Sequence, residues 1–172
     1  MGKIERRDQI RADVGGAVAS SMGKSGLTML LIDTNIFLEL LLGQERADRC
    51  QKFLEMVSEG GLEAVATKFS IHMIEAMLND SELIPIFLRN LRNSIGLHVY
   101  ETSMDDEIAA SMLIKKLKLD FDDGLRYYVA KKLGVKAIVS CGEHFDKTDI
   151  QRKEHQTSSR SLNFIAPSLV RC

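Results

Sequence analysis

The sequence lacks three features that mark common protein classes: a long apolar run, a pair of neighbouring cysteines and an excess of charge of one sign. No stretch approaches the roughly 18 consecutive apolar residues of a membrane-spanning helix. The N-terminal segment also has no apolar core like that of a secretory signal peptide. These absences argue against a membrane protein and against a secreted one, so we expect a cytoplasmic protein.

The cysteine spacing and the charge balance exclude further classes. Cys50, Cys141 and Cys172 form no CxxC pair, which argues against structural zinc and a disulfide framework and favours thiols in a reducing compartment. The 23 basic residues nearly cancel the 24 acidic ones. The overall charge therefore does not indicate bulk binding to a polyanion, although it leaves room for a local basic rim.

Apolar runs alternate with amphipathic segments from residue 27 onward, and this alternation predicts an α/β fold. Residues 1–26 are polar and rich in small side chains, so we expect an N-terminal extension followed by one domain over 27–172. The expected architecture is a three-layer α/β/α arrangement around a central, mostly parallel sheet of about five strands. The predicted strands are 27–32, 63–67, 97–102, 135–140 and 162–166; the predicted helices are 36–42, 45–59, 68–79, 81–93, 103–117 and 122–133, and 146–160 is a polar segment.

The best-marked helix begins at Ser103. Ser103 and Asp106 have the spacing of a capping box, in which each side chain binds a backbone amide at the start of a helix. Met104, Ile108 and Met112 then lie along one side of the predicted helix.

Polar residues follow two of the predicted strands at the point where each strand ends. Asp33, Thr34 and Asn35 come directly after the run "LTMLLI", and Ser140 follows "VKAIV". Ligands of open parallel sheets bind beyond the carboxyl ends of the strands. These residues are therefore candidates for a binding site.

Three further acids lie on predicted helices. Asp122 and Asp123 begin the helix before the strand that ends at Ser140. Glu75 lies within a helix, about 40° around the helical wheel from an apolar stripe. A charge that close to an apolar face needs a partner or a metal ion.

Each acid also has an ordinary structural explanation. Asp33 could cap the helix that follows it. Asp122 and Asp123 could complement the dipole of their helix, and Glu75 could point to water. Taken one at a time, these residues leave both explanations open.

Three segments, taken together, resemble one family. They are "LLIDTNIFL" (30–38), "IHMIEAM" (71–77) and "DFDDGLRYYVAKKLGVKAIVS" (120–140). Their order and spacing resemble those of a PIN domain, the metal-dependent nuclease fold that includes VapC-type toxins. The likeness runs from about residue 28 to residue 167.

The resemblance implies an endoribonuclease that hydrolyses RNA phosphodiester bonds with water activated by Mg²⁺ or Mn²⁺. Asp33, Glu75 and Asp123 would be the metal-binding and catalytic acids, because hard divalent cations prefer carboxylate oxygens. Asp122 would assist them. The residues that would line the pocket are Thr34, Asn35 and Ser140. The resemblance also implies the toxin of a toxin–antitoxin pair, with an antitoxin protein as partner, and a homodimer.

The sequence departs from the family pattern after the strand that ends at Ser140. Gly142 stands where the family commonly has a fourth acid, and His144 stands at a later acidic position. Glu143 or Asp146 could substitute through a shifted loop. The alternative is therefore a catalytically weakened PIN-like module that binds RNA or a protein.

Two other features bear on the choice of function. A phosphatase of the haloacid dehalogenase type also has an aspartate after its first strand, but it needs a second one two residues later, where this chain has Asn35.

RNA phosphates need basic groups nearby. The candidates for such a rim are Lys68, Arg126 and the segment 147–160.

Overall fold

The computed structural model describes residues 29–153, and the α/β fold expected from the sequence is confirmed. Five strands form one sheet in the order β3-β2-β1-β4-β5, and every neighbouring pair is parallel. The strands are β1 (Met29–Ile32), β2 (Glu63–Thr67), β3 (Leu97–Tyr100), β4 (Ala137–Val139) and β5 (Gln151–Lys153).

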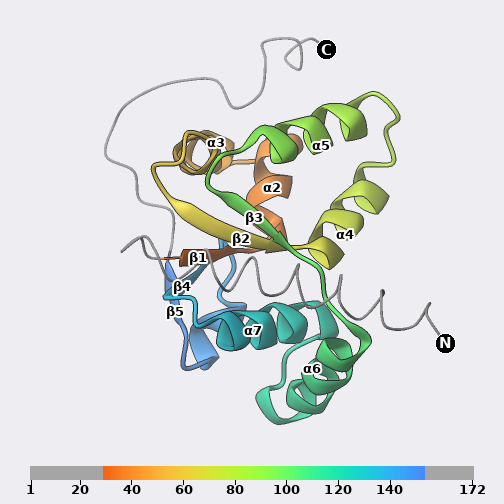
Figure 1. The fold of residues 1–172 in the computed structure, drawn as a ribbon, viewed down its shortest axis with the longest axis vertical. Helices are drawn as coiled ribbons and strands as arrows, with labels where there is room; N and C mark the ends of the chain where they lie inside the picture. The colour runs from red at the N-terminus through yellow and green to blue at the C-terminus, as the bar shows by residue number, and fades with distance from the viewer. Residues whose placement is uncertain (1–28, 154–172) are drawn as a thin grey trace, which may run out of the picture.

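Helices cover both faces of the sheet, which gives the predicted three layers (Figure 1). One face carries α2 (Thr34–Leu41), α3 (Ala47–Ser58), α4 (Lys68–Leu78) and α5 (Leu83–Asn93), and the other carries α6 (Met104–Leu117) and α7 (Phe121–Leu133). Successive side chains of β1 point to opposite faces, so Leu30 and Ile32 join one core cluster while Leu31 joins the other. None of the helices described within residues 29–153 is long and apolar enough to cross a membrane.

The order of the strands places two distant loops side by side. The chain adds β2 and β3 on one side of β1, and then β4 and β5 on the other. Ile32 of β1 is paired with Val139 of β4, and the Asp33 amide donates to the Val139 carbonyl at 3.0 Å. The residues that follow these strands therefore meet at the topological switch point, the usual ligand position in such a sheet.

The fifth strand differs from the prediction. β5, at Gln151–Lys153, lies inside the segment predicted to be polar and irregular, and it pairs with β4 at the edge of the sheet. Gln151 and Lys153 are exposed. The strand therefore forms through its backbone hydrogen bonds with β4 and adds little to the core, as a short edge strand can. The extension 1–26 and the predicted strand 162–166 lie outside the described residues.

Helix α6 has the predicted capping box, but the side that carries Met104, Ile108 and Met112 does not pack against the rest of the fold. Met104 is 72%, Ile108 53% and Met112 75% exposed, whereas Asp106 and Ala110 are buried. The small residues Ala110 and Gly124 allow α6 and α7 to approach each other closely. A Cβ atom added at Gly124 would lie 2.1 Å from the Ile114 side chain.

Asp106 connects three elements at this packed side. Its carboxylate accepts hydrogen bonds from the Tyr100 hydroxyl at 3.0 Å, the Ser103 amide at 2.9 Å and the Lys132 ammonium at 2.6 Å. Burial alone would raise the pKa of Asp106, but the hydrogen bonds from Lys132 and Ser103 hold this pKa below its usual value. The ionised carboxylate is therefore the form that the fold stabilises.

We predict that Asp106→Ala lowers the free energy of unfolding by about 2 kcal/mol at pH 7, because it removes the charged acceptor that three part-buried hydrogen bonds share. A lowered pKa means that this contribution is present above the usual carboxyl value of 3.8 and is lost as the pH falls through the folded value. Urea unfolding of the parent and the variant at pH 7 and near pH 3 measures both effects. Asp105→Ala, an exposed change on the same helix, is the control; equal losses in the two variants would contradict the assignment.

Candidate functional site

Asp33 occupies the capping position of α2 but does not cap that helix. Its backbone is extended, with φ −75° and ψ 146°, and its side chain makes no capping hydrogen bond. The carboxylate instead accepts a hydrogen bond from the Ser140 hydroxyl at 2.6 Å and lies 3.2 Å from Nε of Arg126. The side chain is only 3% exposed, so the ordinary explanation of Asp33 as a helix cap does not apply.

Asp122 and Asp123 lie in the first turn of α7, where acids complement the helix dipole, but neither of them caps the helix. The cap of α7 is Asp120, whose carboxylate accepts from the Asp123 amide at 2.8 Å. The carboxylates of Asp122 and Asp123 turn to Arg126, one helical turn later, with Nη2 at 2.7 Å and 2.5 Å respectively. The two loops at the switch point and the first turn of α7 thus form one acidic cluster, which consists of Asp33, Asp122 and Asp123.

Arg126 lies at the centre of this acidic cluster, and its assignment to an exposed phosphate-binding rim is wrong. Its side chain is 4% exposed, and its Nη1 atom donates to the Thr34 hydroxyl. The guanidinium carbon lies 6.0 Å from the centre of the buried Phe145 ring. The spacing of Arg126 three and four residues after two aspartates is the sequence signal that would have indicated an intrahelical ion pair.

The electrostatics of the acidic cluster are unbalanced. Burial alone would lower the pKa of Arg126, but Asp33 and the two α7 acids raise it above its usual value. Burial also raises the pKa of Asp122, and the nearby guanidinium opposes this shift only in part. The Oδ1 atom of Asp122 is buried without a hydrogen-bond partner among the described residues. The single positive charge of Arg126 therefore neutralises only part of the negative charge of the three aspartates.

The polar residues after β1 and β4 form a connected network beside Asp33. The Asn35 amide donates to the Ser140 hydroxyl at 3.3 Å, and its oxygen accepts from the Cys141 amide at 3.3 Å. The Gly142 amide donates to the same hydroxyl at 3.0 Å. The structure thus places Asn35 and Ser140 beside Asp33, with Thr34 in contact with Arg126.

Glu75 contacts His72 and not the network around Asp33. Its carboxylate is hydrogen bonded to Nδ1 of His72, at 2.8 Å, one turn earlier on α4, and its side chain is 23% exposed. Within residues 29–153 no hydrogen bond or ion pair joins Glu75 to Asp33 or to the α7 acids. The same part of the chain contains no group of three or more His, Cys, Asp or Glu side chains arranged to hold a metal ion.

The loop after Ser140 supplies no fourth carboxylate to the acidic cluster. Glu143 is exposed, and Asp146 forms an ion pair with Arg152. His144 approaches instead, with Nδ1 3.7 Å from Oδ2 of Asp123. A Cβ atom at Gly142 would lie 2.8 Å from the His144 ring, so a larger side chain at position 142 would displace this histidine.

The same loop is tied to α3 by two thiols. The sulfur atoms of Cys50 and Cys141 lie 3.8 Å apart, and burial raises the pKa of both groups. Arg46 donates to the Cys141 carbonyl at 2.5 Å. Protonated thiols of this kind act as packing groups. The third cysteine, Cys172, lies outside the described residues.

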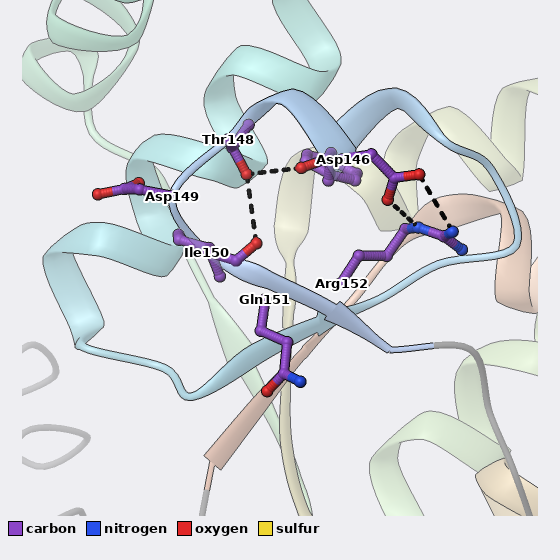
Figure 2. Close-up of a pocket in the computed structure, with 7 residues that line it drawn as sticks. Asp146, Thr148, Asp149, Ile150, Gln151 and Arg152 are labelled. Atoms are coloured by element: carbon purple, nitrogen blue, oxygen red, sulfur yellow. Dashed lines mark hydrogen bonds and ion pairs between the residues drawn. The ribbon is translucent and has the colours of Figure 1, made fainter.

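A separate open pocket of about 380 Å³ lies between the 3₁₀-helix η1 (His144–Lys147) and β5 (Figure 2). Figure 2 shows Asp146 paired with Arg152 on one side and the Thr148 hydroxyl bound to the Phe145 and Ile150 carbonyls on the other. None of the clustered aspartates lines this pocket. Its charged groups compensate each other, so the acidic cluster is the better candidate for a functional site.

Comparisons with known proteins agree with this fold. A model of the PIN domain family matches residues 29–142. The chain is similar in structure to Mycobacterium tuberculosis VapC20, a toxin that cleaves the sarcin–ricin loop, with a TM-score of 0.58 and 14% identity over 70% of this chain and 95% of that one. It is also similar to Rickettsia felis VapBC2 bound to a DNA fragment from its promoter, with a TM-score of 0.53 and 14% identity over 73% of this chain and 97% of that one. No curated protein sequence matches significantly.

We predict that Ser140→Ala lowers the free energy of unfolding by about 2 kcal/mol, because it leaves the Asp33 carboxylate and two part-buried donors without their shared partner. Thermal or urea unfolding at pH 7 measures the loss. Ser111→Ala is the control, since that hydroxyl is exposed on α6 and its removal should change stability by less than about 0.5 kcal/mol. Equal stability of Ser140→Ala and the parent would contradict the proposed network.

Proposed function

Because the chain belongs to the PIN domain family, we propose that it is a metal-dependent endoribonuclease of the VapC type, which hydrolyses RNA phosphodiester bonds. The observation that supports this proposal best is the acidic cluster at the switch point of the sheet. Asp33 comes from β1, and Asp122 and Asp123 come from α7, so residues far apart in the sequence converge in one buried place. Such convergence of like charges is unfavourable without compensating positive charge, and Arg126 supplies one positive charge for three acids.

The donor groups of the acidic cluster fit a hard divalent cation by their chemistry, although the described residues are not arranged around a metal position. All three are carboxylates, the class of ligand that Mg²⁺ and Mn²⁺ prefer, and they exceed the neighbouring guanidinium in charge. The unpartnered Oδ1 atom of Asp122 is an oxygen that a cation could bind. We assign Asp33, Asp123 and Glu75 as ligands, with Asp122 assisting them. Glu75 is included on the family resemblance alone, because its carboxylate binds His72 in the structure.

A divalent ion bound at this place would polarise the scissile phosphate and lower the pKa of the attacking water. The residues of the chain itself hold the site ready. Ser140 donates to Asp33 and fixes the direction in which this carboxylate points. Asn35 holds Ser140 and the Cys141 amide, so the loop after β4 keeps its position beside β1.

RNA is the substrate class that we propose, with an antitoxin protein as the partner that covers the acidic cluster. The structural likeness to VapC20, which cleaves the sarcin–ricin loop, supports the choice of a structured RNA. The likeness to VapBC2 supports a toxin–antitoxin context. At 14% identity these likenesses show a shared fold, so substrate and partner remain proposals for this chain.

One set of observations favours a second candidate, a catalytically weakened PIN-like module that binds RNA or a protein. Gly142 and His144 stand where the family pattern has acids, and Arg126 occupies the centre of the acidic cluster. These differences weaken the case for a second metal ion. A cleavage assay separates the two candidates, because only the nuclease turns over RNA.

We predict that Asp33→Asn reduces Mn²⁺-dependent RNA cleavage by at least about 100-fold, because it removes a charged oxygen ligand from the site. Cleavage of one hairpin RNA and one single-stranded RNA, with Mn²⁺ or with EDTA, measures the effect. Circular dichroism verifies that the variant is folded.

Asp48→Asn is the matched control, because Asp48 is an exposed acid in the first turn of α3. It should cleave like the parent. Cleavage by Asp33→Asn at the parental rate would contradict the assigned chemistry. A folded parent that cleaves neither RNA with Mn²⁺ would favour the binding module.

The exposed side of α6 supports the proposal of a homodimer. If two copies of α6 pack antiparallel around Ile108, then Met104 of each copy faces Met112 of the other. Figure 1 shows α6 at the outer edge of the molecule, where a second copy could reach it.

We predict that Ile108→Glu converts a dimeric parent to a monomer, because it places two like charges at the centre of the packed helices. Light scattering after size-exclusion chromatography measures the mass over a range of concentrations. Met77→Glu, at a residue of α4 that is 58% exposed, should remain dimeric. A monomeric parent, or a dimeric Ile108→Glu variant, would contradict this interface.

A further inference from the structure

Every nitrogen of the Arg126 side chain faces a group of the candidate site. Nε lies at ion-pair distance from Asp33, 3.2 Å away, without a hydrogen bond among the described residues, and Nη2 lies 2.7 Å from Asp122 and 2.5 Å from Asp123. Nη1 donates to the Thr34 hydroxyl. The planar guanidinium fork suits this arrangement, because a lysine ammonium carries its charge at one point and could not reach all four groups equally.

This arrangement is buried, so its charges interact strongly. The side chains of Arg126, Asp33 and Asp123 are 4%, 3% and 7% exposed. Water screens buried charges weakly. Without a positive partner, carboxylates held this close together would repel one another.

Arg126 also contacts each of the three carboxylates that a divalent cation would use. It contacts one oxygen on each of Asp33, Asp122 and Asp123. A metal ion at the acidic cluster would need the same carboxylates within its ligand distance of about 2 Å. Two positive groups held by the same three carboxylates repel each other, so the guanidinium and the metal ion compete for the site.

We propose that Arg126 is a built-in counter-ion, which holds Asp33, Asp122 and Asp123 together in the metal-free protein and must withdraw from at least one of them when a divalent cation binds. The proposal rests on the metal site of the proposed function and adds to it a residue that sets the metal affinity. Arg126 is a positioning residue in this account, since it acts on the aspartates and not on RNA.

The test compares Mn²⁺ binding by the parent and by Arg126→Met, which keeps an unbranched side chain but removes the charge. Calorimetric titration, together with the electron paramagnetic resonance signal of free Mn²⁺, gives the dissociation constant of each protein without any RNA. We expect Arg126→Met to bind Mn²⁺ about tenfold more tightly, because a guanidinium at ion-pair distance attracts the aspartates in competition with the metal. Its melting temperature should fall in EDTA and rise with added Mn²⁺ by more than that of the parent.

Two controls keep the test decisive. Lys131→Met removes a positive charge from the exposed side of the same helix, where Lys131 pairs with Asp149, and should leave the Mn²⁺ affinity unchanged. Arg126→Lys keeps one positive charge and should bind Mn²⁺ with intermediate affinity. If Arg126→Met does not fold in EDTA, nuclear magnetic resonance of the Arg126 Nε–H group in the parent replaces it, and this signal should shift as Mg²⁺ is added.

The outcomes separate this inference from the nuclease proposal. Equal or weaker Mn²⁺ binding by Arg126→Met, or an Arg126 Nε–H signal that does not respond to saturating Mg²⁺, overturns the role of Arg126 and leaves RNA cleavage unaffected. Tighter binding by Arg126→Met in a protein that cleaves no RNA supports the role of Arg126 and overturns only the nuclease. The absence of Mn²⁺ binding by both proteins overturns both proposals.

Discussion

The ion pairs between Arg126 and three aspartates determine how this end of the sheet is built. Asp33 reaches the cluster because β1 pairs with β4, and Asp122 and Asp123 reach it because Asp120 takes over the capping of α7. Removing one partner from a buried ion pair typically costs about 3–5 kcal/mol, since the remaining charge stays unpaired. The guanidinium of Arg126 therefore stabilises the fold at this place, because it keeps three buried carboxylates paired.

The fold could be predicted largely from the sequence, because its strands are apolar runs that must be buried on both faces. β5 escaped prediction since an exposed edge strand such as Gln151–Lys153 leaves no apolar pattern. The side of α6 that packs could not be read from periodicity either. Ala110 and Gly124 bring α6 and α7 into close contact, so the larger side chains of Met104, Ile108 and Met112 remain outside.

The acidic residues of the candidate site could be proposed from the sequence, but the buried positive charge of Arg126 among them could not. The position of Asp33 after a strand indicated a site, whereas Arg126 looked like one more surface charge until its burial was known. Membership of the PIN domain family makes a nuclease the best proposal, and Gly142 and Arg126 are the features in which this chain departs from a simple acidic site. With the role that we propose for Arg126, the chain would carry its acids without a metal ion and yield them to one when it binds.

The most direct test of this account is the anomalous X-ray signal of Mn²⁺ in crystals of the full chain grown at saturating Mn²⁺. The account predicts one strong peak in contact with Asp33 and Asp123, with the Arg126 guanidinium moved away from at least one of the aspartates that it binds in the metal-free protein. A structure with no peak at the acidic cluster, and with all three ion pairs of Arg126 intact, would contradict it.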